Sequence, residues 1–119
     1  MPTIAYLDDD RIQHILMKKL FQIHLPSFEV QTFSKPNSME DWLGNNVVDI
    51  ILSDLNLEGE SAWDWIERFT KISSAPLVFL TAHATPEDLG KMADFPQVKM
   101  IFEKPLAEDD WQKIAGMVS

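Results

Sequence analysis

Residues 47–54 read Val-Val-Asp-Ile-Ile-Leu-Ser-Asp, and the first seven of them form the most apolar stretch of the chain. Several of these residues are β-branched, which favours a strand. A near-continuous apolar run, rather than an alternating one, is typical of a strand buried on both faces of a parallel sheet. Residues 47–53 are therefore predicted to form a central strand, with Asp54 at its end.

Similar patterns recur on both sides of this strand. Short apolar runs predict four further strands, at residues 3–7, 28–33, 77–80 and 98–102. Apolar residues at helical spacing predict five helices, at residues 11–24, 37–43, 61–72, 86–92 and 108–118. This (βα)5 alternation predicts an α/β fold, a doubly wound parallel sheet of five strands with helices on both faces and right-handed crossovers.

Two of the short helices carry recognisable end signals. Asn37 or Ser38 is expected to cap the helix that Gly44 ends. Thr85 is expected to cap the helix of residues 86–92, with Pro86 in its first turn. These signals set the helix boundaries in the prediction.

The helix of residues 11–24 has an amphipathic pattern. Lys18, Lys19 and Gln22 fall on one side. The opposite side carries apolar residues at helical spacing and is expected to face the core. Its members are Ile12, Ile15, Leu16, Leu20 and Ile23.

Composition narrows the class of protein. The 119 residues are enough for one ordinary domain, so we expect residues 1–119 to form a single domain. The chain is 45% apolar and 24% charged, as in soluble globular proteins, and it has no cysteine, which fits a reducing cytoplasm. No apolar run reaches the roughly 18 residues of a membrane span, and no signal-peptide pattern is present. A net charge of −9 disfavours nucleic acid and anionic lipid as partners and favours cations and basic proteins.

Polar residues follow four of the predicted strands. In sheets of this kind, ligands bind at the carboxyl ends of the strands, so these residues are expected to converge. The convergence would bring at least three carboxylates, one hydroxyl and one ammonium into a single pocket. The four strand ends carry Asp8, Asp9 and Asp10, then Ser53 and Asp54, then Thr81 and Ala82, and finally Glu103, Lys104 and Pro105.

The chemistry of such a pocket is restricted. Carboxylates a few ångströms apart repel each other unless a cation neutralises them, and Mg²⁺ is the natural partner for oxygen ligands. An ammonium and a hydroxyl can stabilise phosphoryl oxygens, while one carboxylate acts as the nucleophile. The set therefore predicts that one of these aspartates accepts a phosphoryl group.

The strand-end motifs together make the chain similar to the receiver domain of response regulators, the CheY-like phosphoacceptor module of two-component signalling. The resemblance spans essentially the whole chain and implies the strand order 2-1-3-4-5. The matching segments are residues 4–10, 49–57, 77–82 and 101–105.

The resemblance implies roles for the acidic residues. Asp54 matches the phosphoacceptor, and Asp8 and Asp9 match the acidic pair that holds Mg²⁺, with Asp9 the more direct ligand. Asn56 matches the position whose backbone carbonyl completes the metal site. Asp10 extends the acidic run and is expected to cap the following helix.

The remaining motif residues also match. Thr81 corresponds to the hydroxyl residue that moves toward the phosphoryl group, Lys104 to the family's lysine, and Pro105 to the residue after it, often preceded by a cis bond. The implied activity is transfer from a histidine kinase or a histidine phosphotransfer protein, followed by slow self-hydrolysis. A downstream protein would then read the switch on the face of the fourth helix, fifth strand and fifth helix.

The chain departs from the family pattern at three places. Glu58 stands where a proline is usual, and Ser61-Ala62 stand where Asp-Gly is usual. Ile101 replaces the tyrosine or phenylalanine that normally rotates inward, so an aliphatic or backbone-level readout is expected. Phe102, one position further on, is expected to point to the opposite face of its strand.

Two histidines lie near the predicted site. His83, two residues after Thr81, could overhang the phosphoryl group and modulate hydrolysis, or be a loop histidine. His14 lies on the helix that meets the kinase in this family and is interpreted as a surface residue.

Other functions remain as alternatives. The same fold could serve as a phosphorylation-independent protein-binding module, which Ile101 favours and the intact motif residues oppose. A flavodoxin-type flavin site is disfavoured because Asp8, Asp9 and Asp10 would repel a phosphate. Within the receiver hypothesis, the chain is either a stand-alone regulator without an output domain or a receiver from a larger protein.

Overall fold

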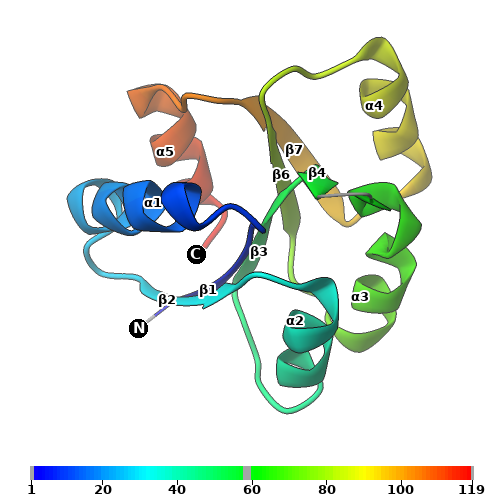
Figure 1. Ribbon diagram of the computed structural model, residues 1–119, viewed down its shortest axis with the longest axis horizontal. Helices are drawn as coiled ribbons and strands as arrows, with labels where there is room; N and C mark the ends of the chain where they lie inside the picture. Colours follow the sequence, from blue (N-terminus) through cyan, green and yellow to red (C-terminus); the bar gives the residue numbers. More distant parts are fainter. Residues whose placement is uncertain (1, 58–59, 119) are drawn as a thin grey trace.

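The computed structural model describes residues 2–57 and 60–118 and shows a parallel sheet with helices on both faces (Figure 1). The sheet order is β2-β1-β3-β6-β7, and each neighbouring pair is parallel. This is the order 2-1-3-4-5 among the five main strands, so the predicted fold class is confirmed. The strands are β1 (Thr3–Leu7), β2 (Glu29–Phe33), β3 (Ile50–Asp54), β6 (Leu77–Thr81) and β7 (Val98–Glu103).

The helices divide between the two faces of the sheet. In Figure 1, α1 and α5 lie on one side, and α2, α3 and α4 lie on the other. A short 3-10 turn precedes α3 and another follows α4. The helices are α1 (Arg11–His24), α2 (Pro36–Leu43), α3 (Ile66–Ile72), α4 (Pro86–Lys91) and α5 (Glu108–Gly116), and the turns are η1 (Ala62–Asp64) and η2 (Met92–Asp94).

The core consists of two apolar layers, one on each face of the sheet. Alternate residues of β3 point to opposite layers, with Ile51 in one layer and Ile50 and Leu52 in the other. Because both faces are covered by helices, the first three residues of this central strand are all apolar, as the sequence predicted. Hydrophobic burial in the two layers fixes the strand register and therefore what stands at each strand end.

The central strand is shorter than predicted. It begins at Ile50 instead of residue 47, and Val47 is 95% exposed. The neighbouring strand β1 begins at Thr3, whose carbonyl accepts from the Asp49 amide, so earlier residues have no strand partner there. A prediction from apolar composition alone therefore placed the start of this strand three residues too early.

The predicted helix of residues 61–72 is also shorter. A small antiparallel hairpin comes first, with Asn56 paired to Ser61, formed by β4 (Asn56–Leu57) and β5 (Glu60–Ser61). The turn η1 follows, and α3 begins only at Ile66. The backbone of residues 60–61 pairs in the hairpin and so does not form the first turn of a helix.

The buried face of α1 differs from the prediction. Met17 and Phe21 are buried, whereas Ile12, Ile15 and Ile23 are exposed. Leu16 is exposed too, and among the apolar residues of the predicted face, Leu20 packs against the core layer. The helix contains two apolar stripes, and the one that packs on the sheet carries the large, deformable Met and Phe side chains.

The caps agree in part. Thr85 caps α4 with a reciprocal capping box to Asp88, as predicted. In α2 the N-cap is Lys35, with Pro36 as the first helical residue, so the predicted caps Asn37 and Ser38 are wrong. Proline at the first position needs no amide partner, which explains the earlier start.

Candidate functional site

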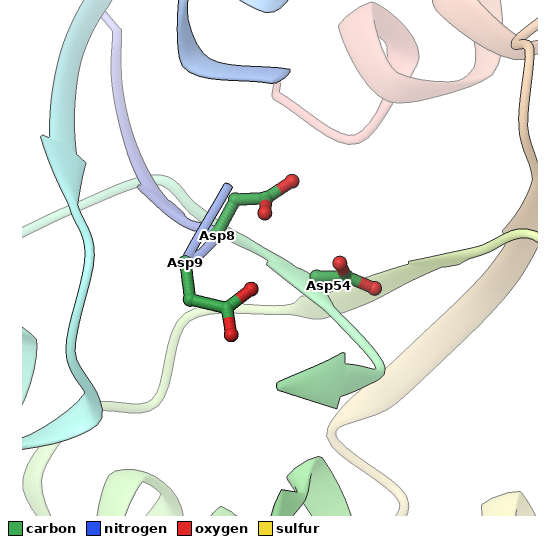
Figure 2. Close-up of side chains that lie close together, drawn as sticks. All are labelled: Asp8, Asp9 and Asp54. Carbon is green, nitrogen blue, oxygen red and sulfur yellow. The ribbon is translucent and has the colours of Figure 1, made fainter. Parts of the chain in front are cut away.

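Three carboxylates converge at the carboxyl ends of β1 and β3. One side-chain oxygen from each of Asp8, Asp9 and Asp54 lies within 4.8 Å of the others. Figure 2 shows the three carboxylates close together at the neighbouring ends of the two strands. Asp8 is fully buried and Asp54 is largely buried. The pairing of Leu7 with Ser53 aligns the two strand ends and so produces this cluster.

Lys104 completes the charge pattern from the end of β7. Its Nζ lies 3.4 Å from Asp54 Oδ2 and 3.5 Å from Asp8 Oδ2, and the side chain is only 19% exposed. The backbone amide of Lys104 donates to the Thr81 carbonyl, which anchors the residue to β6. The Lys104–Pro105 peptide bond is cis. One ammonium therefore faces two carboxylates within a mostly enclosed space.

Asp8 is held by several hydrogen bonds. The Tyr6 hydroxyl donates to its Oδ2 at 2.8 Å, and the Asp10 amide donates to its Oδ1 at 2.9 Å. On α1, His14 Nε2 contacts the Asp8 backbone carbonyl. Asp10 itself caps α1 by accepting from the Ile12 amide, as predicted. These contacts fix the carboxylate at the start of the helix.

Tyr6 is a buried phenol beside a carboxylate. Burial raises its pKa far above the ordinary value, and the hydrogen bond to Asp8 and the negative charges of Asp8, Asp54 and Asp10 raise it further. The phenol therefore remains protonated, and its hydroxyl acts as a donor toward Asp8.

The hydroxyl of Thr81 lies at the end of β6. It donates to the His83 carbonyl at 3.2 Å and accepts from the His83 amide at 3.3 Å, and the residue is buried. The side chain of His83 is 81% exposed, with Nδ1 3.6 Å from Glu103 Oε2. Glu103 also accepts from the Ala84 amide. The loop after β6 is thus tied to the end of β7.

The other residues singled out from the sequence lie around this edge. Asn56 begins β4, two residues after Asp54. Ile101 packs partly buried against the core layer of α2 and α3, and Phe102 is buried in the opposite layer, as predicted. Glu58, noted as a departure from the family pattern, lies outside the described residues.

The donor set fits a hard divalent cation. Carboxylate oxygens from three residues face one space, and such oxygens are the ligands that Mg²⁺ and Ca²⁺ prefer. A cation there would also reduce the repulsion between the three negative charges, which a single ammonium offsets in part.

Sequence reasoning missed two of the residues that contact Asp8. Tyr6 lies in an apolar run and was interpreted only as part of a strand. The spacing held the signal, because a residue near the end of a strand and the residue two positions further on point to the same face. His14 was interpreted as a surface residue but is partly buried against the Tyr6 ring, with ring centroids 5.5 Å apart.

Comparison with protein families identifies the chain. The family model of the response regulator receiver domain matches residues 4–115. The chain belongs to this family and is a receiver domain of the response regulator type, the type of module used in two-component signalling. A search of curated proteins found no match.

Solved structures agree on the fold. A two-component response regulator from Clostridium difficile superposes with a TM-score of 0.85 at 14% identity, covering 98% of this chain and 95% of that one. A chemotaxis response regulator of Vibrio cholerae gives 0.75 at 17% identity, covering 100% and 99%. A response regulator from Burkholderia pseudomallei, crystallised with a phosphorylated aspartic acid, calcium ion and citrate, gives 0.79 at 15% identity, covering 100% and 67%. Among the described residues, no helix is long and apolar enough to cross a membrane.

Proposed function

We propose that Asp54 accepts a phosphoryl group and that this modification switches protein–protein interactions. One observation carries the proposal: the Asp54 carboxylate lies in a cluster with Asp8 and Asp9, and Lys104 Nζ lies 3.4 Å from it. A nucleophile, an acidic cation site and a phosphate-binding ammonium thus share one space. The similar structure from Burkholderia pseudomallei carries a phosphorylated aspartic acid and a calcium ion, which supports the same chemistry on this fold.

The proposed reaction is a transfer from phosphohistidine. A carboxylate oxygen of Asp54 attacks the phosphorus, and a P–O bond forms as the P–N bond breaks. The bonding pair leaves with the imidazole nitrogen, which takes a proton from solvent. In a separate hydrolysis step that restores the free aspartate, a water oxygen attacks the phosphorus of the acyl phosphate, and the protons of the water pass to the released phosphate and to solvent. The Asp54 O–P bond breaks, and inorganic phosphate and the free carboxylate are released.

Other residues of the site stabilise this transfer. Bound Mg²⁺, held by Asp8, Asp9 and the backbone carbonyl of Asn56, would supply positive charge for the phosphoryl oxygens. Lys104 would move its ion pair from the carboxylates to a phosphoryl oxygen. Thr81 would exchange its hydrogen bonds with the His83 backbone for one to the phosphoryl group.

The output side of the switch includes the loop after β6. Movement of Thr81 would displace His83 and its contact with Glu103, which links the site to β7 and α4. Ile101 would transmit the change through packing because it has no ring to rotate. His83 at the rim modulates hydrolysis, and Pro105 positions Lys104. A downstream protein would read the face of α4, β7 and α5.

The donor is proposed to dock on α1. Four exposed residues of α1, Ile12, Ile15, Leu16 and Ile23, form an apolar stripe, and Ile15 lines the same surface pocket as Asp9 of the acidic cluster. Such stripes on a receiver suit the helices of a histidine kinase or a histidine phosphotransfer protein. A cytoplasmic location, and residues 1–119 acting as one receiver domain, complete the proposal.

Acetyl phosphate tests the proposal without a protein donor. With Mg²⁺, the wild-type chain is expected to gain the mass of one phosphoryl group by intact mass spectrometry. Asp54→Asn should gain none, with its fold retained, because the nucleophile is lost and some like-charge repulsion is relieved. If wild type gains no mass, the phosphorylation-independent binding module is favoured instead, and labelling of Asp54→Asn would show that the acceptor is another residue.

A further inference from the structure

The environment of Asp8 points to a residue outside the conventional site. Asp8 is fully buried, and Tyr6 Oη donates to its Oδ2 at 2.8 Å. Lys104 Nζ approaches the same oxygen only at 3.5 Å. The phenol is therefore the closest side-chain donor to the Asp8 carboxylate among the described contacts.

The phenol is itself held in place. Tyr6 is the second-to-last residue of β1 and is paired with Thr32 on one side and Leu52 on the other. Its ring packs edge-on against Phe21, with centroids 5.6 Å apart, and lies against His14. A fully buried ring clamped in this way cannot move its hydroxyl far from Asp8.

The two Asp8 oxygens consequently have different surroundings. Oδ2 accepts hydrogen bonds from the Tyr6 hydroxyl and the Lys104 ammonium, and Oδ1 accepts one from the Asp10 amide. These donors fix the rotation of the carboxylate. They also supply hydrogen bonds to a buried charge that water does not reach.

We infer that Tyr6 is a positioning residue for divalent-cation binding: its hydroxyl holds the Asp8 carboxylate in the orientation in which it faces Asp9 and Asp54. The inference rests on the proposed function, because it assigns a role in the same Mg²⁺ site. Outer-shell partners that orient ligands typically change metal affinity by about 10- to 100-fold when removed. Tyr6→Phe keeps the ring and removes only the hydroxyl.

The test is Mg²⁺ titration by calorimetry in the absence of any phosphodonor. Tyr6→Phe is expected to bind Mg²⁺ about tenfold more weakly than wild type, with far-UV circular dichroism unchanged. A role confined to packing or stability would lower the melting temperature and leave the Mg²⁺ affinity alone. An affinity within twofold of wild type would overturn the inference.

Thr70→Val is the matched control. It also removes one hydroxyl, which donates to the Glu67 carbonyl within α3, away from the acidic cluster. Its Mg²⁺ affinity should equal that of wild type. If Thr70→Val weakened binding as much as Tyr6→Phe, the effect would be a general one and the inference would fail.

A second measurement uses the wild-type chain, in case Tyr6→Phe fails to fold. Tyr6 is the only tyrosine of the sequence, so ring-labelled tyrosine gives one set of NMR signals. The NMR signal of the ring carbon that bears the hydroxyl should shift on addition of Mg²⁺. The size of the shift should reach saturation with the affinity measured by calorimetry. No shift would count against the inference.

Failure of the inference and failure of the proposed function are distinguishable. If wild type is labelled by acetyl phosphate and Tyr6→Phe binds Mg²⁺ normally, only the role of Tyr6 is wrong. If wild type binds Mg²⁺ and Tyr6→Phe binds it more weakly, but wild type gains no phosphoryl group, the role of Tyr6 stands and the proposed function is wrong.

Discussion

The carboxyl end of the sheet and the outer face of α1 lie close together, and they depart from the usual burial pattern in opposite ways. At the strand ends, the charged residue Asp8 is fully buried. Four residues further along the chain, Ile12 on α1 is 74% exposed. Folded proteins generally bury apolar side chains and leave charges in water. In this receiver domain both rules are broken within one short segment.

The difference indicates what each region lacks. A buried carboxylate beside two others is costly unless cations compensate it, and Lys104 compensates only in part. An exposed apolar stripe loses the gain of burial until another surface covers it. The proposed function assigns an ion and a phosphoryl group to the first region and a docking protein to the second. Their adjacency on α1 and β1 fits a donor that delivers its phosphoryl group where it docks.

The largest effect is expected from breaking the buried side of the comparison. Asp9→Ala removes a carboxylate from the three-residue cluster and should weaken Mg²⁺ binding by more than about tenfold, since even outer-shell losses reach that size. Tryptophan fluorescence or calorimetry measures the affinity. Asp94→Ala, which removes an exposed carboxylate in η2, is the control. Unchanged affinity in Asp9→Ala would contradict the metal site.

A smaller effect is expected from the exposed side. Ile15→Asp places a charge in the apolar stripe and should slow phosphotransfer from a phosphorylated histidine kinase that labels the wild type, by roughly tenfold, the effect of about 1.4 kcal/mol. Labelling by acetyl phosphate should not change, because the acidic cluster is intact. The comparison of the two donors on one variant separates docking from chemistry.

Val47→Asp is the matched control for this experiment. Val47 is also highly exposed, but it precedes β3 and lies at the opposite end of the strand from Asp54. Both transfer rates should stay at the wild-type values. Equal loss in Ile15→Asp with both donors would mean that the substitution disturbs the site itself and that the stripe is not a docking surface.

The sequence predicted the buried region better than the exposed one, for a physical reason. The alternation of strands and helices determines which strand ends meet at the sheet edge. The proximity of Asp8, Asp54 and Lys104 could therefore be predicted from the sequence alone. The facing of α1 could not be predicted in this way, because the helix has two apolar stripes. Which of them packs depends on how Met17 and Phe21 fit the sheet.

Structural details that depend on a single tertiary contact could not be predicted from the sequence either. The spacing of Tyr6 and Asp8 places both side chains on one face. The burial of the Tyr6 ring against Phe21 and His14 of α1, which holds its hydroxyl at hydrogen-bonding distance from Asp8, is a tertiary contact that an apolar run does not reveal. The start of β3 at Ile50 depends on where its partner β1 begins. In each case a tertiary neighbour, rather than local sequence, determined the outcome.

The smallest effect is expected where polar and apolar groups follow the ordinary rules. The partly buried ring of Trp63 stacks on Phe95, with centroids 5.6 Å apart, and its indole N–H donates to Asp88 Oδ1 at 3.1 Å. Burial alone would raise the pKa of Asp88. Hydrogen bonds from Trp63 and Thr85 and the charge of Lys91 outweigh it and lower the pKa below its ordinary value. Trp63→Phe should therefore lower the free energy of unfolding by about 0.5–1.5 kcal/mol through loss of the hydrogen bond, and further through loss of packing.

The pH dependence separates the two contributions of Trp63. Because the folded pKa of Asp88 is depressed, its contribution is present above the ordinary carboxyl value of about 3.9 and is lost as the pH falls through the folded pKa. The packing loss does not depend on pH. Urea unfolding of wild type and Trp63→Phe at pH 7 and at pH 3 should give a smaller difference in free energy at pH 3. An equal difference at both pH values would show that the indole N–H contributes nothing measurable, and that this ordinary region depends on packing alone.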